Sequence, residues 1–146
     1  MGQYKEINIQ TKTSNVNNAT KVSQFYKGIS TINENSKSFS LYDTELIKQD
    51  ILNHFNIRKG EKIYNPEFGT MIWGILYEPL TESVREKLME DVSRIIAEDP
   101  RVDARNIIIE EKGYGIQVLL ELEFSAYNHI ETMVLKFDRD SGLSSR

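Results

Sequence analysis

The chain has 146 residues, with 18 Lys and Arg, 22 Asp and Glu, and a formal net charge of −4. This length fits one globular domain, and the mild acidity argues against a general nucleic-acid-binding protein. The lack of cysteine excludes a disulfide framework, a thiol nucleophile and any cysteine-ligated metal site. No apolar run approaches the ~20 residues that cross a bilayer, and charges at positions 5 and 6 interrupt a signal-peptide pattern. We therefore expect a chain that is intracellular or belongs to an assembly built inside a cell.

The N-terminal segment differs in composition from the rest of the chain. Of its first 40 residues, nineteen are Asn, Ser, Thr or Gln, and five Lys against two Glu give a charge of +3. A segment this polar buries too little apolar surface to offset its own ordering entropy. The composition indicates a polar arm over residues 1–38, which is either a partly disordered tail or an arm that becomes ordered on its own body or on a partner.

Two amphipathic helices are predicted in the body of the chain, residues 39–139. The first covers Thr44–Phe55, with Asp43 as its N-cap. Its apolar stripe consists of Leu46, Ile47, Ile51, Leu52 and Phe55. The second begins after the N-cap Thr81 and stops before Pro100. Its apolar face consists of Val84, Leu88, Val92, Ile95 and Ile96, and Asp91 is assigned to a polar face.

The segment between the helices is rich in turn signals. Gly60 ends an Arg-Lys-Gly turn, and Glu61–Tyr64 is interpreted as a short strand. A loop follows, because Pro66 has no amide hydrogen and biases the residue before it away from helix. This loop is Asn65, Pro66, Glu67, Phe68 and Gly69.

Three strands follow the second helix. They cover Asn106–Glu111, a strictly alternating run from Ile116 to Phe124, and Thr132–Phe137. The tight turn between the first two contains two glycines. Short connections predict an antiparallel meander, and helices on one of its faces give a two-layer α+β domain. Residues 140–146 are interpreted as a short polar tail.

Sequence motifs for catalysis are weak. The chain has two histidines, His54 and His129, and neither has a partner at the spacing of a known zinc motif. There is no GxSxG motif and no phosphate-binding loop, so we expect no metal, no cofactor and no enzymatic activity. Carboxylate pairs remain as candidates for glycoside hydrolysis. The carboxylates considered are Glu67, Glu78, Glu98 and Asp99.

The corner after the second helix has a clearer physical use. Pro100 sets the direction of the chain, so that Arg101 projects from a rigid position with a planar fork suited to carboxylates or exposed backbone carbonyls. The alternative is that Arg101 binds the last carbonyls of its own helix.

The order of these features resembles the baseplate-wedge, or sheath-initiator, family of contractile injection machines. The resemblance covers residues 39–137, and the segment from Asn65 to Gly69 is its most specific part. The family includes the small wedge protein of T-even phage baseplates and the equivalent component of the type VI secretion system. The resemblance implies structural work in a tail baseplate within the virion, assembled in the host cytoplasm, without nucleic acid or membrane as a partner.

The resemblance also implies partners and contact residues. Family members surround the tail tube in several copies, bind the core of the wedge and offer a sheet to the first ring of tail-sheath subunits. The family's Glu-Pro-Arg motif corresponds to Asp99, Pro100 and Arg101, where Asp replaces Glu and shortens the side chain by one methylene. For the sheath contact we expect a free sheet edge in the last strand, at Thr132, Val134 and Lys136.

Two other functions remain open at this point. One is a phage muramidase, because some relatives have been labelled lysozyme-like. The other is a small regulatory binding module of the same fold, since one fold hosts unrelated roles.

Overall fold

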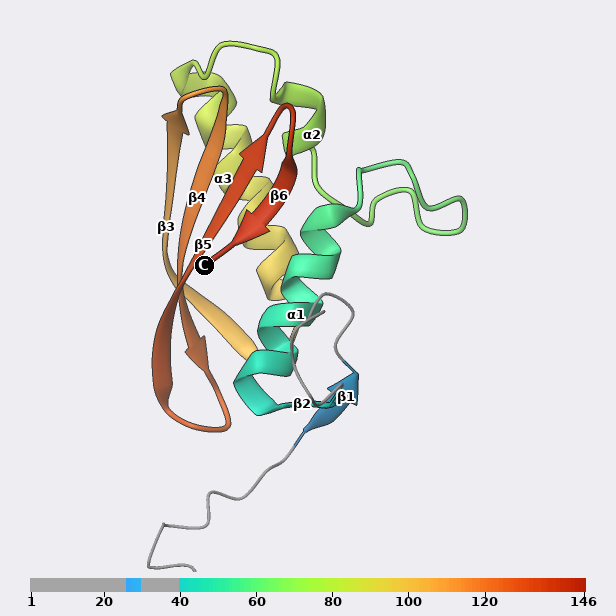
Figure 1. The fold of residues 1–146 in the computed structure, drawn as a ribbon, viewed down its shortest axis with the longest axis vertical. Helices are drawn as coiled ribbons and strands as arrows, with labels where there is room; N and C mark the ends of the chain where they lie inside the picture. Colours follow the sequence, from blue (N-terminus) through green and yellow to red (C-terminus); the bar gives the residue numbers. More distant parts are fainter. Residues whose placement is uncertain (1–25, 30–39) are drawn as a thin grey trace, which may run out of the picture.

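The computed structural model describes residues 26–29 and 40–146 (Figure 1). The N-terminal arm expected over residues 1–38 therefore lies mostly outside the described residues. Three helices and six strands follow in the order β1 (Lys27–Ile29), β2 (Ser40–Tyr42), α1 (Asp43–Asn56), α2 (Ile72–Ile75), α3 (Glu82–Ala97), β3 (Val102–Lys112), β4 (Gly115–Phe124), β5 (His129–Asp138) and β6 (Gly142–Ser145).

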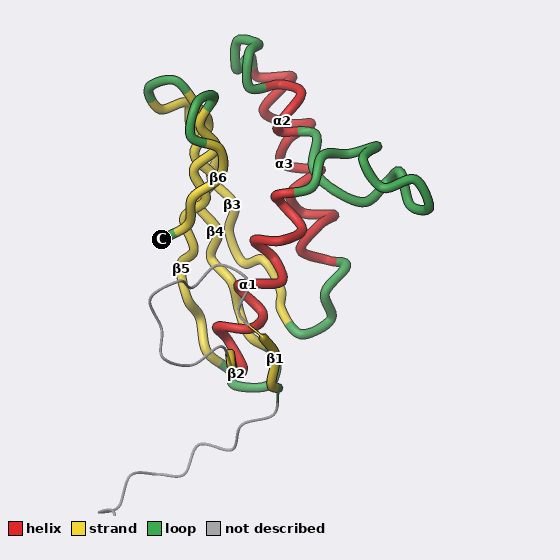
Figure 2. The backbone as a smooth tube through the Cα atoms, turned by 45° about the vertical axis from the view of Figure 1, so that its right-hand side comes forward, coloured by secondary structure: helices red, strands yellow, loops and turns green. Residues whose placement is uncertain are grey.

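The body is a two-layer α+β domain, as predicted. Strands β3, β4, β5 and β6 form an antiparallel sheet in that order, and β1 pairs with β2 in a separate two-stranded sheet. Figure 2 shows the strands of the larger sheet as one layer and the helices as the other. None of the helices in the described part of the chain is both long enough and apolar enough to span a bilayer.

The core lies between the two layers. All five inward residues of β4 are buried, which confirms the predicted alternation: Ile116, Val118, Leu120, Leu122 and Phe124. Leu88, Val92, Ile95 and Ile96 of α3 are also buried, and the Thr81 hydroxyl accepts a hydrogen bond from the Val84 amide, as expected of an N-cap. On α1 the stripe is buried except for the half-buried Leu46.

The start of α1 differs from the prediction. The helix begins at Asp43 itself, with Tyr42 at the preceding position. Asp43 has a φ of 52°, and its carboxylate accepts a hydrogen bond from the Tyr26 amide while its own amide donates to the Tyr26 carbonyl. This residue therefore joins the helix to the segment that leads into β1.

The segment between α1 and α2 contains no strand, so the strand predicted at Glu61–Tyr64 is wrong. The chain folds back on itself instead, and the Gly60 amide donates to the Pro66 carbonyl. An isolated bridge between Arg58 and Thr70 closes the base of this excursion, which we call the 57–71 loop. In Figure 1 the loop projects away from both layers.

Trp73 joins the base of the loop to the core. Its indole Nε1 donates to the Phe55 carbonyl at 2.8 Å, near the end of α1. Its ring meets the Phe137 ring edge-on, with centroids 5.4 Å apart and an interplanar angle of 75°. Trp73 thus contacts both α1 and the sheet.

The prediction for the sheet edge needs correction, because residues 140–146 are not a free tail. Gly142, with a φ of 81°, follows a turn in which the Asp138 carboxylate accepts two backbone hydrogen bonds, and β6 then pairs with β5. Val134 exchanges both backbone hydrogen bonds with Arg146, and Lys136 is paired with Ser144. Val134 and Lys136 are therefore not at an open edge.

Thr132 lies beyond the part of β5 that β6 covers. Within the described residues, β3 has a partner strand on one side only, where it pairs with β4. This outer side of β3 is the longest strand edge in the sheet that no described strand covers.

Candidate functional site

A groove of about 440 Å³ lies where α1, the end of α3 and the 57–71 loop meet. Helix α1 contributes Asp50, Ile51 and His54, and the end of α3 with the turn after it contributes Ile95, Glu98, Asp99, Pro100 and Arg101. The loop contributes Phe68. We call this site the corner groove. It brings one residue of the predicted loop motif together with all three residues of the predicted Asp-Pro-Arg corner.

The Arg101 guanidinium is held by carboxylates of its own chain. Its Nε donates to Asp99 Oδ1 at 2.8 Å and one terminal nitrogen donates to Asp99 Oδ2 at 2.6 Å, so the ion pair is bidentate. The same nitrogen also donates to Asp50 Oδ2 at 2.7 Å. The guanidinium fork thus binds carboxylates, which is one of the uses that the sequence suggested, but these carboxylates belong to its own chain. None of these contacts is with the last carbonyls of the helix.

These contacts shift the pKa of both partners. Hydrogen bonds from Arg101 to Asp99 raise the pKa of the guanidinium, and burial opposes this only in part. Burial alone would raise the pKa of Asp99, but hydrogen bonds and charge from Arg101 outweigh it and lower that pKa. Asp99 is thus kept ionised, which does not suit a general acid.

Phe68 is stacked on α1. Its ring lies parallel to the His54 ring with centroids 3.8 Å apart, and the Lys62 Nζ lies 3.7 Å from its centroid. The Gly69 amide donates to His54 Nε2 at 3.3 Å, so that nitrogen must be unprotonated. Burial lowers the pKa of His54, which favours this neutral form, although Glu98 at 3.7 Å opposes the shift.

Gly69 is required for the close approach of the loop to the end of α1. It has a φ of 104°, and a Cβ at this position would lie 2.6 Å from the Ile57 carbonyl oxygen. A side chain would therefore push the loop away from its seat.

A buried carboxylate on α3 holds the end of the loop. Asp91 is 5% exposed and accepts hydrogen bonds from the Thr70 hydroxyl and the Met71 amide, both at 2.9 Å. Arg94 pairs with Asp91 at 2.8 Å and donates from the same nitrogen to the Gly69 carbonyl at 2.8 Å. Assigning Asp91 to a polar face was wrong. The available signal was its position, three residues after Leu88 and four before Ile95, on the apolar face.

The remaining predicted residues lie elsewhere. Asn65, Pro66 and Glu67 are exposed in the loop, where Glu67 pairs with Lys59 at 2.9 Å. Thr132, Val134 and Lys136 belong to β5 and do not line the groove. In residues 26–29 and 40–146, no group of three or more His, Cys, Asp or Glu side chains could hold a metal ion.

The groove combines an apolar floor with an acidic rim. Ile51, Ile95 and Pro100 supply apolar surface. Asp50 and Glu98 pair with Arg101 and Arg94, yet their side chains remain 45% and 44% exposed. Such a surface suits a partner segment that carries an apolar side chain beside a cation. No protein-family model matches this chain, and no curated protein matches it either.

Proposed function

We propose that this protein is a structural, non-enzymatic component of a contractile-tail baseplate wedge. It binds the wedge core through the corner groove and starts the first ring of sheath subunits by accepting a strand. The proposal begins from the resemblance of residues 39–137 to the wedge family. It places the chain in the tail baseplate of a virion, in several copies around the tail tube.

The observation that carries the proposal is that two motif segments, separated by about 30 residues in sequence, line one groove. Phe68 comes from the loop motif, and Asp99, Pro100 and Arg101 form the corner. A partner that recognises both motifs finds them on a single surface. Because Arg101 is already paired, we assign it the role of positioning Asp50 and Asp99 for the cation of a partner.

The sheath contact belongs on the outer side of β3. Antiparallel pairs alternate between hydrogen-bonded and non-hydrogen-bonded positions. Residues 133, 135 and 137 of β5 point their backbone groups toward β4, because Val134 bonds Arg146 on the other side. When the same register is followed across β4, the backbone N–H and C=O groups of Glu110 and Lys112 face β4. Those of Glu111 face away from the sheet. Such an edge accepts a strand from another chain.

The test is the composition of contractile particles purified from cells that express the chain. We expect the chain as a stoichiometric component. Arg101→Ala should compete about 30-fold less well than the unsubstituted chain for incorporation, because the loss of one partner from an ion pair that the complex would bury costs at least ~2 kcal/mol. Arg85→Ala, which removes a pair with Glu82 on α3 outside both the groove and β3, is the matched control and should compete equally.

Absence of the chain from such particles would exclude the proposal. If the chain is present but Arg101→Ala competes as well as Arg85→Ala, the protein belongs to the particle and the corner groove is not its binding site. The free energy of unfolding of both variants, measured separately, distinguishes lost binding from lost folding.

A further inference from the structure

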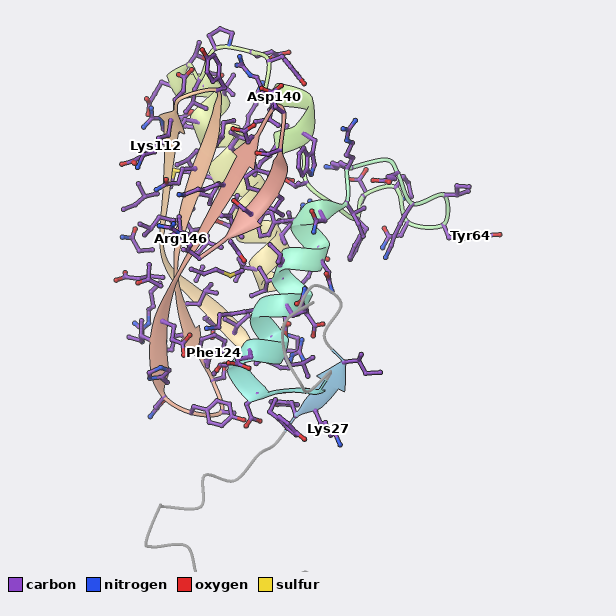
Figure 3. The ribbon with its side chains drawn as sticks, viewed as in Figure 1. Lys27, Tyr64, Lys112, Phe124, Asp140 and Arg146 are labelled. Atoms are coloured by element: carbon purple, nitrogen blue, oxygen red, sulfur yellow. The ribbon has the colours of Figure 1, made fainter. Side chains whose placement is uncertain are left out.

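The outermost turn of the 57–71 loop carries two large hydrophobic side chains that are almost fully exposed. The Asn65 amide donates to the Lys62 carbonyl at 3.2 Å, which closes a turn with Ile63 and Tyr64 at its centre. These side chains are 90% and 102% exposed. Figure 3 shows Tyr64 at the outer end of the loop, pointing away from the helices and the sheet. We call these two residues the loop tip.

The loop tip has no role in the packing of the described chain. The central positions of tight turns favour Gly, Asn, Asp, Ser and Pro, each for a backbone reason. Ile and Tyr offer no such advantage, and at these exposures they bury almost no surface. Apolar residues that gather on a surface without packing indicate contact with another molecule.

The loop holds its tip in place through short-range contacts. Three backbone hydrogen bonds hold the loop. The Gly60 amide donates to the Pro66 carbonyl at 2.8 Å, the Glu61 amide donates to the Arg58 carbonyl at 3.0 Å, and the Phe68 amide donates to the Asn65 carbonyl at 3.1 Å. The base is seated by Asp91 and Arg94. An anchor that is rigid before binding loses less conformational entropy on association.

The charges near the tip are already engaged within the loop. Lys59 pairs with Glu67, and Lys62 lies over the Phe68 ring. The Glu61 carboxylate accepts a hydrogen bond from the Arg58 amide at 2.9 Å. With the cations occupied and two carboxylates beside them, the tip does not suit an anionic membrane or a nucleic acid.

We propose that Ile63 and Tyr64 form a protein-binding anchor that enters an apolar pocket of a partner protein, where a hydrogen-bond acceptor meets the Tyr64 hydroxyl. A Tyr side chain buries about 150–250 Å². The tip alone is thus far below the ~1,200 Å² of a specific interface, so it acts beside a second contact. We take that contact to be the corner groove, which the same loop lines through Phe68, and in this respect the inference rests on the proposed function.

The experiment places the photo-crosslinking amino acid p-benzoylphenylalanine at position 64 of the full chain in cells that assemble the particles. The matched control carries it at position 114, because Tyr114 is also a turn tyrosine and is 75% exposed. We expect position 64 alone to crosslink to apolar residues of one other protein of the particle. Ile63→Ala should lower the yield about tenfold without changing the melting temperature, since Ile63 buries almost no surface.

A competition assay adds a second measurement. Tyr64→Ala should enter the particle about 30-fold less well than the unsubstituted chain, which is typical of an anchor residue, whereas Tyr114→Ala should compete equally. A crosslink to a protein outside the particle would keep the anchor but show that it does not act beside the wedge contact, while the composition of the particles still decides the wedge function. A crosslink to lipid or to a second copy of this chain would overturn the anchor, whether or not the wedge function holds. The same conclusion would follow if position 64 gave no more crosslinked product than position 114.

Discussion

Replacing Asp91 tests how the loop is attached to the helical layer. The carboxylate is 5% exposed and accepts hydrogen bonds from Thr70, Met71 and Arg94. In Asp91→Ala the Thr70 hydroxyl, in a residue that is 0% exposed, and the Met71 amide lose their acceptor. Each unsatisfied buried group costs about 1–3 kcal/mol. Including the charged partner Arg94, we expect the free energy of unfolding to fall by about 3–5 kcal/mol.

The assay is urea denaturation of the full chain followed by circular dichroism. Asp91→Asn keeps one oxygen acceptor, so its loss should be smaller than that of Asp91→Ala. Glu90→Ala, an exposed neighbour on the same helix, should change the free energy of unfolding by less than about 0.5 kcal/mol. If Asp91→Ala is as stable as Glu90→Ala, the carboxylate does not hold the loop and the reasoning fails.

Three further predictions concern titration, the sheet edge and catalysis. Because burial lowers the folded-state pKa of His54, the neutral form stabilises the fold above the unfolded-state pKa, and this contribution is lost as the pH falls through the folded-state pKa. The free energy of unfolding should therefore decrease on acidification below about pH 6.5. His54→Gln should flatten this pH dependence, and an unchanged pH profile in that variant would contradict the prediction. Glu111→Pro removes an outward backbone donor from β3 while leaving the pairing with β4 intact, so particles with this variant should assemble baseplates but polymerise sheath poorly, and Glu111→Ala should behave normally. Purified chain should not hydrolyse peptidoglycan, and turnover that a single Glu→Gln substitution abolishes would show the opposite.

The regular elements could be predicted because their patterns are long and physically constrained. The β4 alternation extends over nine residues, from Ile116 to Phe124, and α3 has both a hydroxyl N-cap and a proline after its end. Strand β6 was missed because four residues, Gly-Leu-Ser-Ser, contain one large apolar side chain and show no period. It forms because the turn before it, made by the Asp138 carboxylate and the positive φ of Gly142, aligns its backbone with β5, and Gly142 lies in the segment interpreted only as a polar tail.

The site was only partly predictable. The corner residues and Phe68 were named from motifs, but the pairing of Arg101 with Asp50 joins residues 51 positions apart. Nothing in the spacing of two charged residues on separate elements predicts such a contact. The loop tip was missed for a different reason: Ile63 and Tyr64 favour a strand by composition, and the backbone hydrogen bonds of the loop overrode that preference.

The position of Trp73 gives the protein a built-in optical reporter. It is the only tryptophan in the sequence, so the intrinsic emission excited selectively in indole comes from this one junction between α1, the base of the loop and the sheet. Separation of the half-buried indole from the Phe55 carbonyl and the Phe137 ring would expose it further to water and shift its emission to longer wavelength, even while the strands keep their far-ultraviolet signal. Time-resolved fluorescence can thus follow the seating of the helical layer separately from the formation of the sheet.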